Sequence, residues 1–137
     1  MEEYVRTIIP YHAMPRTNGR HSPESIMLLK RAEEPFKGHF DLPGGQRSGY
    51  DDSMLDAAIR EVWEETGLGA VLEPLKSQGG TNGKGEQMHI EYYEALATEG
   101  RFSLNLDEFF RHEQYFFDAE EVKGLNIAFE NNKRIIS

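Results

Sequence analysis

The chain has 137 residues, the length of one domain, and its 15 Lys and Arg against 24 Asp and Glu give a formal net charge of −9. This acidic balance argues against nucleic acid and against an anionic membrane as partners, because both require a basic face. Cysteine is absent, which excludes disulfide scaffolds, cysteine zinc sites and thiol nucleophiles. No apolar run approaches the roughly 18 residues of a membrane span, and the acidic N-terminus is unlike a signal peptide. We therefore expect one cytoplasmic domain over residues 1–137.

The predicted elements mix strands with helices along the whole chain. Runs of β-branched and aromatic residues indicate strands, and clusters of Gly and Pro indicate turns. In chain order the elements are a strand over residues 4–11, a strand over 25–31, a turn-rich loop over 35–50, a helix over 52–68, strands over 71–77 and 87–98 around a glycine-rich hairpin, a strand over 115–117 and a helix that Asp118 caps. This order predicts an α/β or α+β fold.

The helix over residues 52–68 has well-marked ends. Ser53 fits the N-cap position, and Gly67 fits a left-handed C-terminal cap. Four residues recur at helical spacing and form a stripe that we expect to face the core: Leu55, Ile59, Val62 and Thr66.

Three glutamates share another face of this helix. Glu61, Glu64 and Glu65 lie at i, i+3 and i+4, where each close pair of like charges costs roughly 0.2–0.5 kcal/mol. They also lie near the helix C-terminus, where the macrodipole disfavours anions. A solvated acidic face is one interpretation. The other is a site for a divalent cation such as Mg²⁺, which carboxylate oxygens suit and which would remove the repulsion. The unfavourable position of the charges favours the second.

The flanking sequence carries a longer pattern. Pro43-Gly44-Gly45 is followed about fifteen residues later by Arg-Glu-Val-Trp-Glu-Glu-Thr-Gly-Leu over residues 60–68. The combination resembles the motif of the Nudix hydrolase family, whose members include MutT-like proteins. In that motif a Gly is followed by five residues and a Glu, and then by seven residues and Arg-Glu. In this chain, seven residues separate Arg60 from Asp52, which stands where the motif has Glu. Six residues rather than five separate Asp52 from Gly45. We expect the shorter acid to affect the loop geometry rather than metal binding.

The resemblance implies a fold and a chemistry. The Nudix fold is an α/β fold with a mixed β-sheet sandwiched between α-helices. Members hydrolyse the diphosphate linkage of a nucleoside diphosphate joined to another group, and they use Mg²⁺ or Mn²⁺. Carried onto this chain, Glu61, Glu64, Glu65 and the Gly45 carbonyl would hold the metal, and Arg60 would orient the carboxylates.

The catalytic base and the substrate contacts are less fixed within the family. The base is either Glu61 or a glutamate from a later loop, for which Glu113 is the first choice and Glu108 and Glu91 are weaker ones. We expect the remaining substrate contacts from Arg31 and Arg47, which suit phosphates, and from Gly44, where the backbone can approach a ligand closely.

Two other classes remain to be weighed. A non-catalytic Nudix-fold module that binds a nucleotide or a protein partner would be expected to lose helix acids, and here all three are present. An isomerase of isoprenoid diphosphates would be expected to use a cysteine, which the chain lacks. The substrate stays open among nucleoside triphosphates, nucleotide sugars and ADP-ribose-type compounds. A homodimer is compatible with the family.

Overall fold

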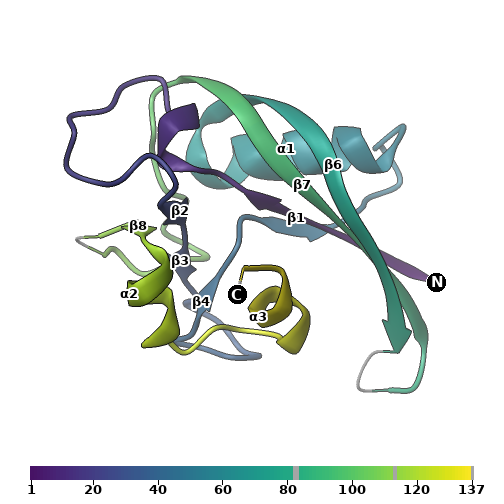
Figure 1. The fold of residues 1–137 in the computed structure, drawn as a ribbon. Coiled ribbons are helices and arrows are strands. Elements are labelled where there is room, and N and C mark those ends of the chain that lie inside the picture. The colour runs from purple at the N-terminus through teal and green to yellow at the C-terminus, as the bar shows by residue number, and fades with distance from the viewer. Residues whose placement is uncertain (82–83, 113, 137) are drawn as a thin grey trace.

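The computed structural model describes residues 1–81, 84–112 and 114–136, and its centre is a mixed four-stranded sheet in the order β5-β1-β7-β6 (Figure 1). Strand β1 (Glu2–Ile8) runs parallel to β7 (Gln87–Gly100) and antiparallel to the short β5 (Gly44–Gln46). Strand β6 (Leu68–Thr81) pairs antiparallel with β7, and the two form the long twisted ribbon in Figure 1. The sheet thus places Gly44 and Gly45, which we call the glycine loop, beside β1.

The remaining elements surround this sheet. Two small two-stranded sheets pair β2 (Ile26–Met27) with β8 (Phe116–Phe117), and β3 (Leu29–Lys30) with β4 (Phe40–Asp41). The helices are α1 (Met54–Thr66), α2 (Ala119–Lys123) and α3 (Glu130–Ile136), and a 3₁₀ turn η1 spans Tyr11–Ala13. Within the described ranges, no helix combines the length and the apolar character needed to cross a membrane.

Alternate residues of β1 and β7 face opposite layers of the molecule, as the two-residue period of a strand requires. Val5 and Tyr93 pack with Ala57 and Ala58 of α1. Their neighbours Tyr4, Ile8, Ile90 and Tyr92 belong to a second cluster, which includes Ile135 and Ile136 of α3. The sheet therefore lies between α1 and α3, which confirms the expected mixed sheet between helices (Figure 1).

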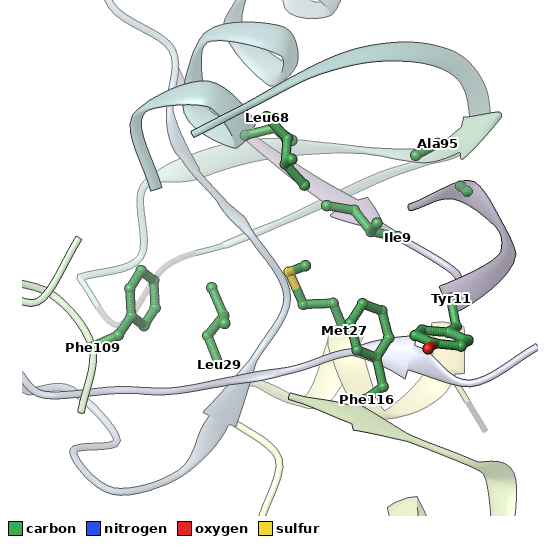
Figure 2. Packing of buried hydrophobic residues seen from close by; sticks show 10 residues of the cluster. Ile9, Tyr11, Met27, Leu29, Leu68, Ala95, Phe109 and Phe116 are labelled. Atoms are coloured by element: carbon green, nitrogen blue, oxygen red, sulfur yellow. The ribbon is translucent and has the colours of Figure 1, made fainter. Parts of the chain in front are cut away.

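A third hydrophobic cluster lies around η1 and β2. Its labelled members in Figure 2 are Ile9, Tyr11, Met27, Leu29, Leu68, Ala95, Phe109 and Phe116. Leu68 directly follows the Gly67 cap of α1, and Phe109 belongs to the loop after β7. This packing ties the C-terminal end of α1 to the loop over residues 101–110.

Helix α1 has the predicted ends, and its buried face includes Val62 and Thr66 of the predicted stripe. The Ser53 Oγ accepts a hydrogen bond of 3.0 Å from the Asp56 N–H, and Gly67 has a φ of 76°. Leu55, however, is 38% exposed, whereas Ala57 and Ala58 are fully buried. The small alanine side chains let the helix approach the sheet closely, so the buried face extends beyond the predicted stripe and Leu55 lies at its edge. Glu61 and Glu65 lie on the side of the helix that contacts the glycine loop.

The other predicted elements differ mainly in extent. The strand expected over residues 25–31 is divided into β2 and β3, and the ribbon strands are longer than expected. Strands β4 and β5 lie inside the segment predicted as a turn-rich loop, and α3 was not predicted. Because β4 and β5 are only two and three residues long, their pairing partners rather than a sequence pattern define them.

Candidate active site

The backbone of Gly44 and Gly45 lies so close to β1 and α1 that a side chain would not fit at either position. A Cβ on Gly45 would lie 2.6 Å from the Glu61 Oε1, and one on Gly44 would lie 2.0 Å from the Val5 carbonyl oxygen. The Gly44 N–H also donates a 2.9 Å hydrogen bond to the Glu65 Oε2. Two glycines in succession therefore let β5 fit between β1 and α1, with backbone against carboxylates.

The three predicted metal ligands differ in exposure. Glu65 is 3% exposed, Glu61 is half-buried and Glu64 faces solvent. Burial raises the pKa of Glu65 well above its usual value, and the negative charge of Glu61 raises it further. Burial also raises the pKa of Glu61, although the Arg60 charge opposes this shift. The fold thus places two carboxylates together where water solvates them poorly, which is unfavourable without a cation.

Arg60 links these acids to the loop. Its Nη1 lies 3.1 Å from the Glu61 Oε1 and 3.0 Å from the Glu64 Oε2. Its Nε and Nη2 each donate a 2.9 Å hydrogen bond to one oxygen of Asp51, in a bidentate pair. Hydrogen bonding from Arg60 lowers the pKa of Asp51 from 3.8 to about 2. One guanidinium group therefore orients two of the predicted ligands.

The acid that supports Arg60 is Asp51, and not Asp52 as the count back from Arg60 suggested. Asp52 is exposed, whereas the Asp51 side chain is 5% exposed and also accepts a 2.9 Å hydrogen bond from the Ser48 N–H. Five residues separate Gly45 from Asp51, so the spacing from the glycine matches the family motif. The extra residue lies between Asp51 and Arg60. Counting forward from Gly45 would have found this acid.

The donor atoms fit a hard divalent cation. Carboxylate oxygens and a backbone carbonyl are the ligands that Mg²⁺ and Mn²⁺ prefer, and a cation would relieve the repulsion between Glu61 and Glu65. In the described ranges, no three acidic or histidine side chains gather closely enough to hold an ion between them. Arg60 donates hydrogen bonds to Glu61 and Glu64, and the Gly44 N–H donates one to Glu65.

A cavity of about 240 Å³ opens beside the glycine loop, and Glu65 lies in its wall. Arg31 also lines it, with its Nη1 2.9 Å from the Asp41 Oδ2 and its Nε bonded to the Pro35 carbonyl. Arg47 is not among the described residues that line it. That side chain lies 3.5 Å from Glu3 and donates to the Asp51 carbonyl. The structure thus brings Arg31 and Gly44 to the cavity and directs Arg47 toward the loop and β1.

Of the three loop glutamates, Glu108 lies at the cavity. Burial raises its pKa, as do the charges of Glu33 and Glu64, while Arg31 lowers it. Glu91 lies on β7, where it accepts a 2.7 Å hydrogen bond from the Tyr93 hydroxyl. Glu113, the first choice from the sequence, lies outside the described residues. Nothing in the local sequence distinguishes Glu108 from its neighbours, because its position depends on how the loop packs through Phe109.

Comparison with known proteins identifies the family. The family model of the NUDIX domain matches residues 12–136, a range that contains the glycine loop, α1 and the loop acids. The chain therefore belongs to the NUDIX family.

Individual relatives agree with this assignment. The ADP-ribose pyrophosphatase of Methanocaldococcus jannaschii is 49% identical over 43 residues, which are 31% of this chain and 25% of that protein. The chain thus matches a quarter of the length of that curated relative. A MutT NUDIX hydrolase from Burkholderia pseudomallei has a TM-score of 0.72 at 22% identity, over 98% of this chain and 94% of that one. The NUDIX domain of Shewanella oneidensis NrtR, solved with ADP ribose, has a TM-score of 0.71 at 19% identity, and the match covers 97% of this chain and 82% of that one. At these identities the solved structures establish a common fold.

Proposed function

We propose that this chain, as a single domain over residues 1–137, is a Mg²⁺- or Mn²⁺-dependent hydrolase of a nucleoside diphosphate linked to another group. The observation that carries the proposal is the pair of poorly solvated carboxylates, Glu61 and Glu65, held against the glycine loop. Such a pair is costly for stability and is suited to a cation that in turn binds phosphates. The named activity of the Methanocaldococcus relative and the ADP ribose bound to the Shewanella neighbour support a nucleotide derivative as substrate.

The metal would be held by oxygens of Glu61, Glu64 and Glu65 together with the Gly45 carbonyl. When bound, a divalent cation neutralises diphosphate oxygens and lowers the pKa of a coordinated water. Arg60 keeps Glu61 and Glu64 turned toward the loop, and Asp51 keeps Arg60 in place. In this chain Arg60 and Asp51 are positioning residues.

Proton removal from the attacking water requires a carboxylate that is free to accept a proton. Glu61 is hydrogen-bonded to Arg60, whereas Glu108 lines the cavity with a raised pKa. We assign the general base to Glu108, with Glu61 as the alternative, and Glu113 stays a prediction of the sequence. Arg31 and Gly44 line the cavity, and we keep them as proposed substrate contacts.

A hydrolysis panel tests the proposal. The substrates are nucleoside triphosphates, a nucleotide sugar and ADP-ribose, with Mg²⁺, and the proteins are the wild type, Glu64→Gln and the exposed-strand control Glu73→Gln. We expect the wild type and the control to release product from at least one substrate, and the rate of Glu64→Gln to fall by roughly 10² or more. Equal rates in all three proteins would refute the assigned role, and nucleotide binding without turnover would favour the non-catalytic module. The cytoplasmic location and the homodimer remain predictions.

A further inference from the structure

A charged side chain lies inside the sheet next to the proposed metal site. Arg6 is on β1 between Tyr4 and Ile8, which belong to an apolar cluster, and its side chain is 12% exposed. Its Nη1 lies 2.9 Å from the place where a Cβ on Gly44 would be, so the guanidinium group runs directly under the glycine loop. Burying a guanidinium group is costly, which suggests that the position serves a ligand.

The guanidinium groups of Arg6 and Arg31 retain donors that the protein does not use. The Arg6 Nη1 donates to the Val5 carbonyl at 3.3 Å, and the Arg31 Nε and Nη1 donate to Pro35 and Asp41. In the described part of the chain, the Nη2 of either arginine has no hydrogen-bond acceptor. The centroid of the Phe129 ring lies 5.7 Å from the Arg6 Cζ and 5.5 Å from the Arg31 Cζ, so one ring contacts both guanidinium groups.

The acceptor between the two arginines is already occupied. The Asp41 Oδ1 accepts a 2.8 Å hydrogen bond from the Asn132 Nδ2 and lies 3.5 Å from the Arg6 Nε. Its Oδ2 accepts from Arg31 at 2.9 Å. This end of the cavity therefore offers hydrogen-bond donors, and a ligand there must present acceptors.

The charge and the size of the cavity restrict the class of ligand further. Two guanidinium groups line the cavity against four carboxylates, those of Glu33, Asp41, Glu65 and Glu108, so a further anion is disfavoured. Tyr4, Leu42 and Phe109 supply flat or apolar wall. The volume of about 240 Å³ lies below the range of pockets that enclose a drug-sized ligand, so the cavity has room for one planar base, and the phosphates would lie outside it, beside Glu61 and Glu64, which are not among its described lining residues. A neutral ring with carbonyl acceptors meets all three conditions.

We propose that Arg6 reads the nucleobase of the substrate and selects bases with a carbonyl at C6 of a purine or C4 of a pyrimidine over bases with an amino group at that position. Arginine pairs well with the adjacent carbonyl oxygen and ring nitrogen of an oxopurine, whereas an exocyclic amino group opposes a donor to a donor. The assignment rests on the proposed function, because a nucleotide substrate is what brings a base into this cavity.

Matched ligand pairs test this directly. IMP and AMP differ at one exocyclic group, as do UMP and CMP, and their binding to the intact protein in metal-free buffer is measured by calorimetry or NMR titration. We expect the wild type to bind the oxo member of each pair at least about tenfold more tightly, and Arg6→Met to reduce that ratio below about threefold. Arg16→Met, a change at an exposed arginine outside the cavity lining, is expected to keep the wild-type ratio.

The controls separate base reading from other roles. Arg6→Lys keeps the buried charge but loses the bidentate geometry, so it is expected to fold even if Arg6→Met does not, and to lose most of the preference. Equal affinity of the wild type for both members of each pair would overturn the proposal. So would an equal loss for all four ligands and for inorganic pyrophosphate in the Arg6 variants, which would assign Arg6 to phosphate. Because no turnover is measured, failure of the hydrolase proposal would show separately in the hydrolysis panel.

Discussion

At the scale of single residues, the site is organised by one bidentate ion pair. Arg60 and Asp51 share two hydrogen bonds of 2.9 Å, and the same guanidinium group reaches two of the proposed metal ligands. A planar fork of this kind fixes both direction and distance, which a lysine would not do. The positions of Glu61 and Glu64 therefore depend on an aspartate ten or more residues away in sequence.

Removing that aspartate is expected to affect both stability and activity. Asp51→Asn should lower the free energy of unfolding by about 2 kcal/mol at pH 7, since its pKa is lowered from 3.8 to about 2 in the folded state. A lowered pKa stabilises the fold above the unfolded value of 3.8, so this contribution should fade as the pH falls from about 4 to about 2. Urea unfolding between pH 2 and 7 measures it. The control Asp52→Asn should change stability by less than about 0.5 kcal/mol, and a larger loss in Asp52→Asn than in Asp51→Asn would contradict our assignment.

The glycine contact predicts a second residue-level effect. In Gly45→Ala the added methyl group would meet the Glu61 carboxylate at 2.6 Å, so the helix or the loop must shift. We expect a loss of about 1–3 kcal/mol, as for other overpacked sites, together with weaker metal binding. Gly49→Ala is the matched control, because a Cβ at Gly49 has nothing within 4 Å. Thermal unfolding compares the two, and equal melting temperatures would argue against the close contact.

At the scale of elements, α1 shows what sequence reasoning can and cannot find. The caps at Ser53 and Gly67 were predictable because they depend on local backbone geometry. The buried face was predictable only in part: Val62 and Thr66 of the predicted stripe are buried, but hydrophobic spacing favours large side chains and gives little weight to alanine. Here Ala57 and Ala58 form the contact with the sheet, and Leu55 is left partly exposed. The orientation of the acidic face follows from this close packing.

The packing predicts that a substitution on the buried side of α1 lowers stability more than a substitution on its partly exposed side. Ala58→Leu would insert a large side chain against Val5 and Tyr93, and we expect it to cost about 1–3 kcal/mol. Leu55→Ala removes a partly exposed side chain and should cost less than about 1 kcal/mol. Chemical denaturation of both variants checks this. A larger loss for Leu55→Ala than for Ala58→Leu would contradict this packing.

At the scale of the whole molecule, the sequence pattern was sufficient to predict the family and the fold. The cavity was not predictable, because its walls come from β1, from the segment after β3, from the glycine loop and from the loop after β7. Arg6 and Glu108 are far apart in the chain and belong to no motif, so only the folded sheet brings them together. Arg31 was predictable because it lies near the glycine loop in sequence.

The central claim is that the carboxylates of α1 bind a divalent cation, and a calorimetric titration with Mg²⁺ tests it most directly. The proteins are the wild type, Glu65→Gln, which keeps the shape of the buried side chain, and the exposed-strand control Glu73→Gln. The fluorescence of Trp63, the single tryptophan, which lies beside Glu64 on α1, provides a second signal. We predict saturable uptake by the wild type and by Glu73→Gln, with affinity at least about tenfold lower in Glu65→Gln. The absence of uptake by the wild type, or equal affinity in all three proteins, would contradict the account.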